Sequence, residues 1–208
     1  MRFEPSDVLA DGRIVSPSAE RNKVPITELL MRVLPKQGNV LEISSGTGQH
    51  VLHFAQAMPH IRWQPTEQDA DCLKSIASWL APAPLPNVNA PMHLDVHDKV
   101  WPVGEVVAVV CLNMIHIAPP SATEALLRGA GKVIYSGGIL FLYGPYRRQG
   151  RHTSVTNEAF DELLRAKNPE WGVRNLEDIA LLAASEGLEL QEIHDMPANN
   201  LALVLRKR

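Results

Sequence analysis

The apolar positions of the chain follow two patterns, short continuous runs typical of buried strands and a 3.6-residue period typical of helices. Mostly apolar runs predict strands at residues 39–44, 60–67, 92–96, 105–114, 137–144, 188–196 and 200–206. Apolar residues at helical spacing predict helices near 26–33, 51–58, 73–80, 121–134, 156–167 and 176–186. Residues 1–23 show neither pattern, so we expect an irregular segment there. Pro25 then suits the first turn of the first helix, and Asn175 is placed to cap the last one.

The order of these elements predicts the topology of the sheet. Strands that alternate with helices form right-handed crossovers and an open parallel sheet covered on both faces. The last two strands are joined only by the short segment PANN, which cannot make a parallel return, so they must pair antiparallel. The sequence therefore predicts one α/β domain over 1–208, with a doubly wound, mostly parallel seven-stranded sheet and an antiparallel C-terminal hairpin. Ligands of such sheets bind beyond the carboxyl ends of the strands.

The stretch LEISSGTGQH, residues 41–50, leads from a predicted strand through a glycine turn into a helix. Gly46 and Gly48 fit the dinucleotide-binding fingerprint, but Val51 stands where its third glycine belongs, and no lysine follows as in a phosphate-binding loop. Glu42 precedes the glycines and would repel a pyrophosphate, whereas it would attract a cationic ligand. The turn therefore favours S-adenosylmethionine, with its sulfonium and ammonium groups. A tight turn that holds no ligand is the alternative.

Polar residues follow the other predicted strands at the same edge of the sheet. Glu67 ends the second strand and is placed to accept hydrogen bonds from ribose hydroxyls, while Asp69 is a second candidate or a helix N-terminal acid. Asp95 is placed to accept from an adenine amino group, with Val96 donating its backbone amide. The fourth strand ends in Asn113, Met114, Ile115 and His116, where the methyl group of the cofactor is expected.

A metal site is an alternative use of the third strand. His93, Asp95 and His97 are spaced so that a strand would present all three on one face as ligands. No distant ligand cluster accompanies them, and we expect no metal. His50 and His53 are expected on the surface of the helix that follows the glycine turn.

Composition narrows the class of protein. The chain has 208 residues, 45% of them hydrophobic, with a net charge of −3 and a pI near 6.2. That balance gives no general attraction to nucleic acid or to an anionic membrane, and we expect neither partner. No signal peptide or membrane-spanning run is evident, which predicts a cytoplasmic protein. The two cysteines, Cys72 and Cys111, match no metal or redox spacing and are expected to be buried thiols.

Several motifs together resemble one family. They are SAERNKVPI, LEISSGTGQH, NMIHIAPP, YGPY, TSVTNEAFD, WGVRN and MPANNLALVLRK, which span nearly the whole chain. They are similar to the poorly characterised family that includes methyltransferase-like protein 26. The resemblance implies a class I S-adenosylmethionine-dependent methyltransferase fold. Many methyltransferases have glycine where Ser44 stands, which leaves the loop geometry open.

The resemblance also implies which residues hold the cofactor. Glu42 and the glycine turn would contact the methionine side, Glu67 the ribose, and Asn113 would lie beneath the methionine portion. The full expected set is Glu42, Ser44, Gly46, Thr47, Gly48, Glu67, Asp95, Val96 and Asn113.

The remaining motif residues are expected to form the acceptor pocket. The candidates are Arg21, Asn22, Tyr146, Asn157, Trp171 and Arg174, although Tyr146 and Trp171 are equally typical of packing residues. Residues 144–175 form a possible substrate lid. The basic cluster of Arg147, Arg148 and Arg151 is either a solvated loop or an anion-binding part of that lid.

Two residues at strand ends are candidates for the chemistry. His116 is placed as a general base, and Tyr143 as a residue that orients the acceptor by hydrogen bonding. The alternative for His116 is that it only ties its loop to a backbone carbonyl. We therefore expect methyl transfer from S-adenosylmethionine to a small molecule or a protein side chain. A non-catalytic module that binds the nucleoside and a nicotinamide-dependent oxidoreductase are the alternatives, and the oligomeric state stays open.

Overall fold

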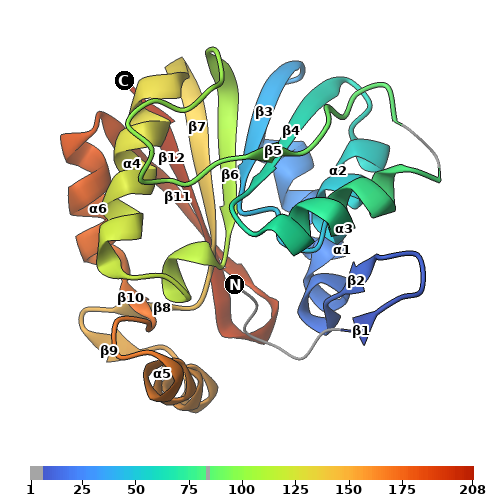
Figure 1. The fold of residues 1–208 in the computed structure, drawn as a ribbon. Helices are drawn as coiled ribbons and strands as arrows, with labels where there is room; N and C mark the ends of the chain where they lie inside the picture. Colours follow the sequence, from blue (N-terminus) through green and yellow to red (C-terminus); the bar gives the residue numbers. More distant parts are fainter. Residues whose placement is uncertain (1–6, 83–84) are drawn as a thin grey trace.

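A twisted, mostly parallel sheet forms the centre of the molecule in the computed structural model, which describes residues 7–82 and 85–208 (Figure 1). Residues 1–6 of the segment expected to be irregular lie outside the described residues. The strands of the central sheet, in spatial order, are β11 (Leu188–Met196), β12 (Asn200–Lys207), β7 (Ile134–Gly144), β6 (Val106–Leu112), β3 (Gly38–Ile43), β4 (Ile61–Glu67) and β5 (Met92–His93).

The pairing of these strands confirms the predicted topology. β5, β4, β3, β6 and β7 pair in parallel, whereas β12 runs antiparallel to both β7 and β11. The third strand is shorter than expected, because β5 ends at His93 and the residues after it form a loop. This is the doubly wound, seven-stranded sheet with an antiparallel C-terminal hairpin of the class I methyltransferase fold.

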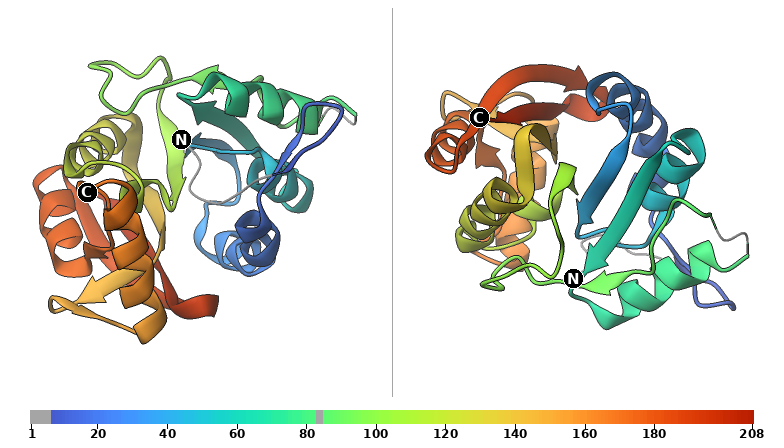
Figure 2. Two further views of the ribbon diagram at one scale, coloured as in Figure 1. Left: turned by 60° about the horizontal axis from the view of Figure 1, so that its bottom comes forward. Right: turned by 90° about the horizontal axis from the view of Figure 1, so that it is seen from above.

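Helices cover both faces of the sheet (Figure 2). The helices of the two layers are α1 (Pro17–Val33), α2 (Gln49–Ala57) and α3 (Ala70–Leu80) on one face, and α4 (Pro120–Val133) and α6 (Leu176–Ser185) on the other. In β6, Ala108 and Val110 pack towards α1 and α2, while Val109 and Cys111 pack towards α4 and α6. Burial on both faces explains why this strand is apolar throughout.

The first helix begins earlier than the sequence pattern indicated. A short hairpin precedes it, formed by β1 (Asp7–Val8) and β2 (Ile14–Val15). α1 starts at Pro17, where the Ser16 hydroxyl accepts a hydrogen bond from the Ala19 amide at 3.5 Å. Pro25 therefore lies inside the helix and not in its first turn. The prediction of an irregular segment to residue 23 was wrong. The first turns of α1 are mostly polar, so they lack a helical apolar pattern, and they line a cavity at the carboxyl ends of the strands.

An insertion between β7 and α6 extends below the carboxyl ends of the strands (Figure 1). It contains β8 (Tyr146–Arg148), β9 (Arg151–His152), α5 (Val155–Lys167) and β10 (Arg174–Asn175). Asn175 occupies the N-cap position of α6, but its side chain makes no cap and accepts instead from the Gly150 amide at 3.0 Å. Within the described residues, no helix combines the length and apolar character needed to cross a bilayer. Both cysteines are free and buried, as predicted.

Candidate functional site

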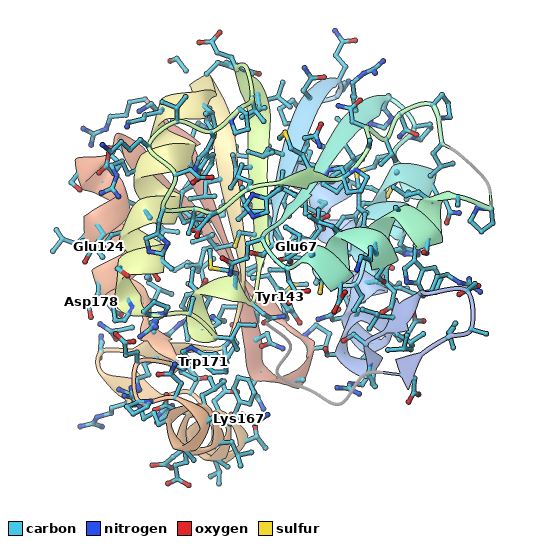
Figure 3. All side chains as sticks on the ribbon, in the orientation of Figure 1. Glu67, Glu124, Tyr143, Lys167, Trp171 and Asp178 are labelled. Carbon is cyan, nitrogen blue, oxygen red and sulfur yellow. The ribbon has the colours of Figure 1, made fainter. Side chains whose placement is uncertain are left out.

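A cavity of about 870 Å³ lies at the carboxyl ends of β3, β4, β6 and β7, a size within the usual range for small-molecule sites. Most of the predicted site residues line it. They are Arg21, Asn22, Glu42, Ser44, Gly46, Thr47, Glu67, Asp95, Val96, Asn113, Tyr143 and Asn157. Figure 3 shows Glu67 and Tyr143 in the centre of the molecule, from strands on opposite sides of β3 and β6.

The glycine turn that follows β3 has an unusual backbone. Ser44, Gly46 and Gly48 all have positive φ, at 53°, 59° and 95°. A Cβ on Gly48 would lie 2.7 Å from the Cα of Ile76 in α3, so only glycine allows the two helices to approach this closely. Gly48 itself does not line the cavity. Gly48 contributes to the shape of the turn. Ser44 adopts a left-handed backbone conformation, which glycine adopts more readily than serine.

Glu67 links the glycine turn to the end of β4. Its Oε2 accepts from the Gly46 amide at 3.0 Å, and its Oε1 accepts from the Gln68 amide at 2.8 Å. The side chain is buried. Asp69, the second candidate for the ribose, instead caps α3 by accepting from the amides of residues 71 and 72. Glu67 therefore fixes the turn and also presents its carboxylate at the cavity wall.

Glu42 is a buried acid on the opposite side of the turn. Its side chain is 1% exposed, and its Oε2 has no hydrogen-bond partner among the described residues. Burial, reinforced by the nearby carboxylate of Glu67, raises the pKa of Glu42 to about 8. A buried oxygen without a partner is costly, and a cation in the cavity would relieve that cost.

The loop after β5 forms one end of the cavity, where the sequence predicts that the adenine would bind. The carboxylate of Asp95 accepts from the His97 amide and lies 2.9 Å from the His97 Nδ1, and these hydrogen bonds lower its pKa. Because β5 ends at His93, the three candidate metal ligands do not share one strand face. In residues 7–82 and 85–208, no group of three or more His, Cys, Asp or Glu side chains is arranged to hold a metal ion.

The first turn of α1 is attached to the glycine turn by the Gln49 side chain. Its Oε1 accepts from the Ser16 amide at 2.6 Å and from the Thr47 hydroxyl at 2.9 Å. This attachment brings Arg21 and Asn22 to the cavity wall. The link depends on residues far apart in the sequence, so the helical spacing gave no sign of it.

His50 was expected on the surface of α2, and that expectation was wrong. It lines the cavity, and its Nε2 lies 2.8 Å from the Asn22 Oδ1. Burial, together with the neighbouring His53, lowers the pKa of His50 to about 4, so the ring is neutral at physiological pH. Its position couples the helix after the glycine turn to the start of the chain.

His116 does not line the cavity, which removes it as a general base. Asn113 adopts a left-handed conformation, with φ at 60°, and a 3-10 turn, η1 (Met114–His116), follows it. This turn directs His116 away from the cavity, edge-on to the Tyr146 ring with 5.1 Å between centroids. The side chain is 1% exposed, and burial, with the charge of Arg174, lowers its pKa to about 3. A buried, neutral ring behind the wall has a packing role.

The position of His116 predicts an effect on acid stability. Its pKa is depressed in the folded protein, so between about pH 6.5 and 3 the unfolded chain binds a proton that the folded protein does not. The free energy of unfolding must therefore fall as the pH falls through this window. In urea denaturation, the free energy of unfolding should fall between pH 7 and pH 5 in the wild type. We expect the fall to be smaller by roughly 2 kcal/mol in His116→Gln. S-adenosylmethionine affinity should not change, and identical pH slopes for both proteins would contradict the assignment.

Three other predicted acceptor residues also lie outside the cavity wall. Tyr146 is fully buried, and Trp171 packs with Leu164 and Val173 within the insertion. Arg174 donates to the carbonyls of Ile115 and Ala118, at 2.9 and 2.5 Å. These side chains hold the loop after β6 against the insertion, so their assignment to substrate binding was wrong.

The basic cluster of the insertion does not line the cavity either. Arg147 forms an ion pair with Asp161, which also accepts from Arg165 at 3.1 Å. Arg148 lies 3.9 Å from the carboxylate of Asp195. Arg147 therefore stabilises the insertion through Asp161, and neither an anion-binding lid nor a freely solvated loop describes this residue.

The sequence reasoning missed the wall opposite the glycine turn. The connection between β11 and β12, η2 (Pro197–Asn199), lines the cavity together with Asn200, Thr156 and Phe160. Ala198 and Asn199 both have positive φ, at 59° and 57°. Thr156 and Phe160 lie in the segment 144–175 that the sequence predicted as a possible substrate lid, whereas the PANN segment indicated only the hairpin.

Comparison with known families and structures extends this description. The sequence profile of a family described as "Protein of unknown function (DUF938)" matches residues 13–207. Three solved structures are similar to this one. The first is an O-methyltransferase family protein from Burkholderia thailandensis, with 13% identity and a TM-score of 0.76. The others are the SAH-bound form of CalO1, a methyltransferase in calicheamicin biosynthesis (15% identity, TM-score 0.74), and the S-adenosylmethionine-dependent methyltransferase SibL (16% identity, TM-score 0.76). In the same order, the matches cover 88%, 92% and 91% of this chain but only 55%, 54% and 55% of the other chains. This chain therefore spans about half the length of the solved proteins. At these identities the likeness shows the fold alone.

Proposed function

Because the chain belongs to the DUF938 family, whose description states no activity, we propose its function from the cavity: it binds S-adenosylmethionine and transfers the methyl group. The observation that carries the proposal is the buried Glu42 carboxyl beside the glycine turn, whose Oε2 has no hydrogen-bond partner in the described part of the chain. A sulfonium or ammonium group is the kind of ligand that would stabilise its ionised form. The resemblance of the sequence motifs to the family that includes methyltransferase-like protein 26 supports the same proposal.

The cavity wall offers a partner for each part of this cofactor. Glu42, Ser44 and Thr47 would surround the methionine portion, with Asn113 beneath it. Glu67 would accept from the ribose, and the loop that contains Asp95 and Val96 would contact the adenine. S-adenosylmethionine, when bound, supplies a methyl group on a good leaving group. The chain would then hold the acceptor in line and exclude water, and orientation of this kind is worth up to about 7–11 kcal/mol.

The acceptor side of the cavity differs from the one first expected. Tyr143, Asn22 and Asn157 line that side, and the histidine on that wall is His50 and not His116. The acceptor is a small molecule or a protein side chain in this proposal, and a cytoplasmic location stays a prediction from the sequence.

Ligand-dependent stability tests the proposed cofactor directly. We expect S-adenosylmethionine and S-adenosylhomocysteine each to raise the melting temperature, with about 2.7 kcal/mol of stabilisation at one hundred times the dissociation constant. NADH should have no effect, because it carries no cationic group that would stabilise the ionised form of Glu42. Differential scanning fluorimetry with the three ligands is the measurement. Equal stabilisation by NADH, or none by either adenosyl ligand, would refute the proposal.

A further inference from the structure

Tyr143 lies at the end of β7, in the wall opposite the glycine turn, with its hydroxyl held by side chains from distant parts of the chain (Figure 3). The Asn200 Nδ2 donates to the Tyr143 hydroxyl oxygen at 3.0 Å and to the Pro197 carbonyl at 3.1 Å. A carbonyl only accepts, so the orientation of the Asn200 amide is fixed, and Tyr143 must be the acceptor in this pair.

The Asn22 side chain approaches the same hydroxyl. Its Oδ1 lies 2.8 Å from the His50 Nε2, and since an amide oxygen only accepts, that nitrogen carries the proton. The Asn22 amide nitrogen is then the group that donates to Tyr143, and its hydrogen bond, like that of Asn200, opposes the rise in the pKa of the buried phenol. Two amide donors thus occupy the lone pairs of the Tyr143 oxygen. The proton of the Tyr143 hydroxyl is then available to a ligand in the cavity, and that ligand must present a hydrogen-bond acceptor atom.

The titratable groups on this side of the cavity determine which acceptor fits. Glu42, Glu67 and Asp95 belong to the glycine turn and the adenine end, while Arg21, His50 and Tyr143 belong to the side of α1 and β7. On that second side, the lining residues of the described chain include no carboxylate to balance an ammonium. They also offer no effective base, because burial and the neighbouring His53 lower the pKa of His50 to about 4, and burial raises the pKa of the Tyr143 phenol and keeps it neutral.

A substrate hydroxyl or ammonium must lose a proton during methylation, whereas a carboxylate is already ionised at neutral pH. Building on the proposed methyl transfer, we propose that the acceptor is a small-molecule carboxylate, one oxygen of which accepts a hydrogen bond from the Tyr143 hydroxyl. A lone pair of a carboxylate oxygen forms the new bond to the methyl carbon, and the electron pair of the carbon–sulfur bond goes to sulfur. The products are a methyl ester and neutral S-adenosylhomocysteine, and no proton leaves.

The wall around this site suits a compact acceptor. The η2 connection is hydrogen-bonded to α5 at two points, where the Asn157 Nδ2 donates to the Asn199 carbonyl at 2.9 Å and the Asn199 Nδ2 donates to the Thr156 hydroxyl at 3.1 Å. These contacts hold the C-terminal hairpin against the insertion across the end of the cavity. Phe160 adds an apolar surface there, which fits a small carboxylate with a hydrophobic body.

Binding of three matched probes to the protein saturated with S-adenosylhomocysteine tests the inference. Benzoate, benzamide and benzylamine share a ring and differ in the acceptor group. We expect benzoate to bind at least about tenfold more tightly than the other two in calorimetry at pH 7.5. Tyr143→Phe should weaken benzoate about tenfold, as for loss of a hydrogen bond to a charged group, and leave S-adenosylhomocysteine affinity unchanged. Tyr135→Phe, the same change at an exposed position near the start of β7, is the control.

The outcomes separate the two proposals. Failure of S-adenosylhomocysteine itself to bind would refute the proposed function. If it binds but benzamide or benzylamine binds as well as benzoate, or if Tyr143→Phe binds benzoate like the wild type, the carboxylate assignment is wrong.

The product gives an independent test. The protein is incubated with methyl-labelled S-adenosylmethionine and a deproteinised cell extract, and the product is treated with alkali. We expect label in the small-molecule fraction that alkali releases as volatile methanol, because esters hydrolyse whereas methyl ethers and methylamines do not. Label that survives alkali would overturn the carboxylate assignment. Label incorporated only when the protein fraction is restored would overturn the small-molecule assignment.

Discussion

Glu42→Gln is expected to weaken S-adenosylmethionine binding roughly tenfold to a hundredfold, the range for loss of an interaction with a charged group. At the same time it should stabilise the free protein at pH 8. Both effects follow from one buried carboxyl, which is 1% exposed and has an oxygen without a hydrogen-bond partner in residues 7–82 and 85–208. The amide keeps the shape of the side chain but not its charge, so the variant separates ligand attraction from packing.

The sign of the stability effect follows from the raised pKa of Glu42, about 8 against an ordinary value of 4.5. Below pH 4.5 the carboxyl is protonated in both states and contributes nothing. Between pH 4.5 and 8 the unfolded chain loses the proton and the folded protein keeps it, so the free energy of unfolding falls as the pH rises. One pKa unit corresponds to about 1.4 kcal/mol, which sets an upper limit of roughly 5 kcal/mol for this loss at pH 8.

Urea denaturation of the free protein between pH 5 and 8, with calorimetry of S-adenosylmethionine binding, measures both effects. Glu42→Gln should exceed the wild type in stability at pH 8 and approach it at pH 5. Glu124→Gln, on the outer side of α4 (Figure 3), is the matched control and should change neither quantity. Parallel stability curves for Glu42→Gln and the wild type would show that the carboxyl is ionised in the free protein.

Gly48→Ala is expected to lower the free energy of unfolding by about 2–4 kcal/mol and to abolish high-affinity cofactor binding. The residue has a φ of 95°, which costs an L-residue about 1–2 kcal/mol. Its new Cβ would also lie 2.7 Å from the Ile76 backbone, and overpacking of this kind costs typically 1–3 kcal/mol. Relief of the backbone strain or of the close approach to Ile76 must move the turn that carries Gly46 and Thr47.

Gly137→Ala provides the matched control, because Gly137 also has a positive φ, 86°, but no atom within 4 Å of the position of a Cβ. It should show the backbone strain alone and bind the cofactor normally. Chemical denaturation and calorimetry of both variants separate the two costs. If the two variants lost equal stability and Gly48→Ala kept its affinity, the close approach of α2 and α3 would not control the site.

Much of the cavity wall around the glycine turn was predictable from local sequence. Glu42, Gly46, Glu67 and Asn113 each follow or end a strand whose apolar pattern is clear. A parallel sheet brings all carboxyl ends to one edge, so the position of a residue along the chain is enough to place it near the site. The antiparallel C-terminal hairpin was predictable for a similar reason, since three connecting residues cannot make a crossover.

The acceptor side was not predictable in the same way. His116 stands only three residues beyond Asn113, but the left-handed backbone of Asn113 turns the chain and buries the ring behind the wall. Tyr143 lies at the end of β7 and Tyr146 just beyond the strand, yet only Tyr143 lines the cavity. The direction of a side chain after a strand end depends on one or two dihedral angles, which the pattern of apolar residues does not record.

The sequence by itself determined the order of strands and helices, the antiparallel ending and the acid beside the glycine turn, because these depend on spacing and on connection length. Only the tertiary structure decided how the groups from the two ends of the chain act together. It brings Asn22 and Asn200 to the hydroxyl of Tyr143 and leaves an oxygen of Glu42 without a partner among the residues that the structure describes. Hydrogen bonding and pKa depend on which distant atoms meet in the folded protein, and spacing along the chain carries no information about that.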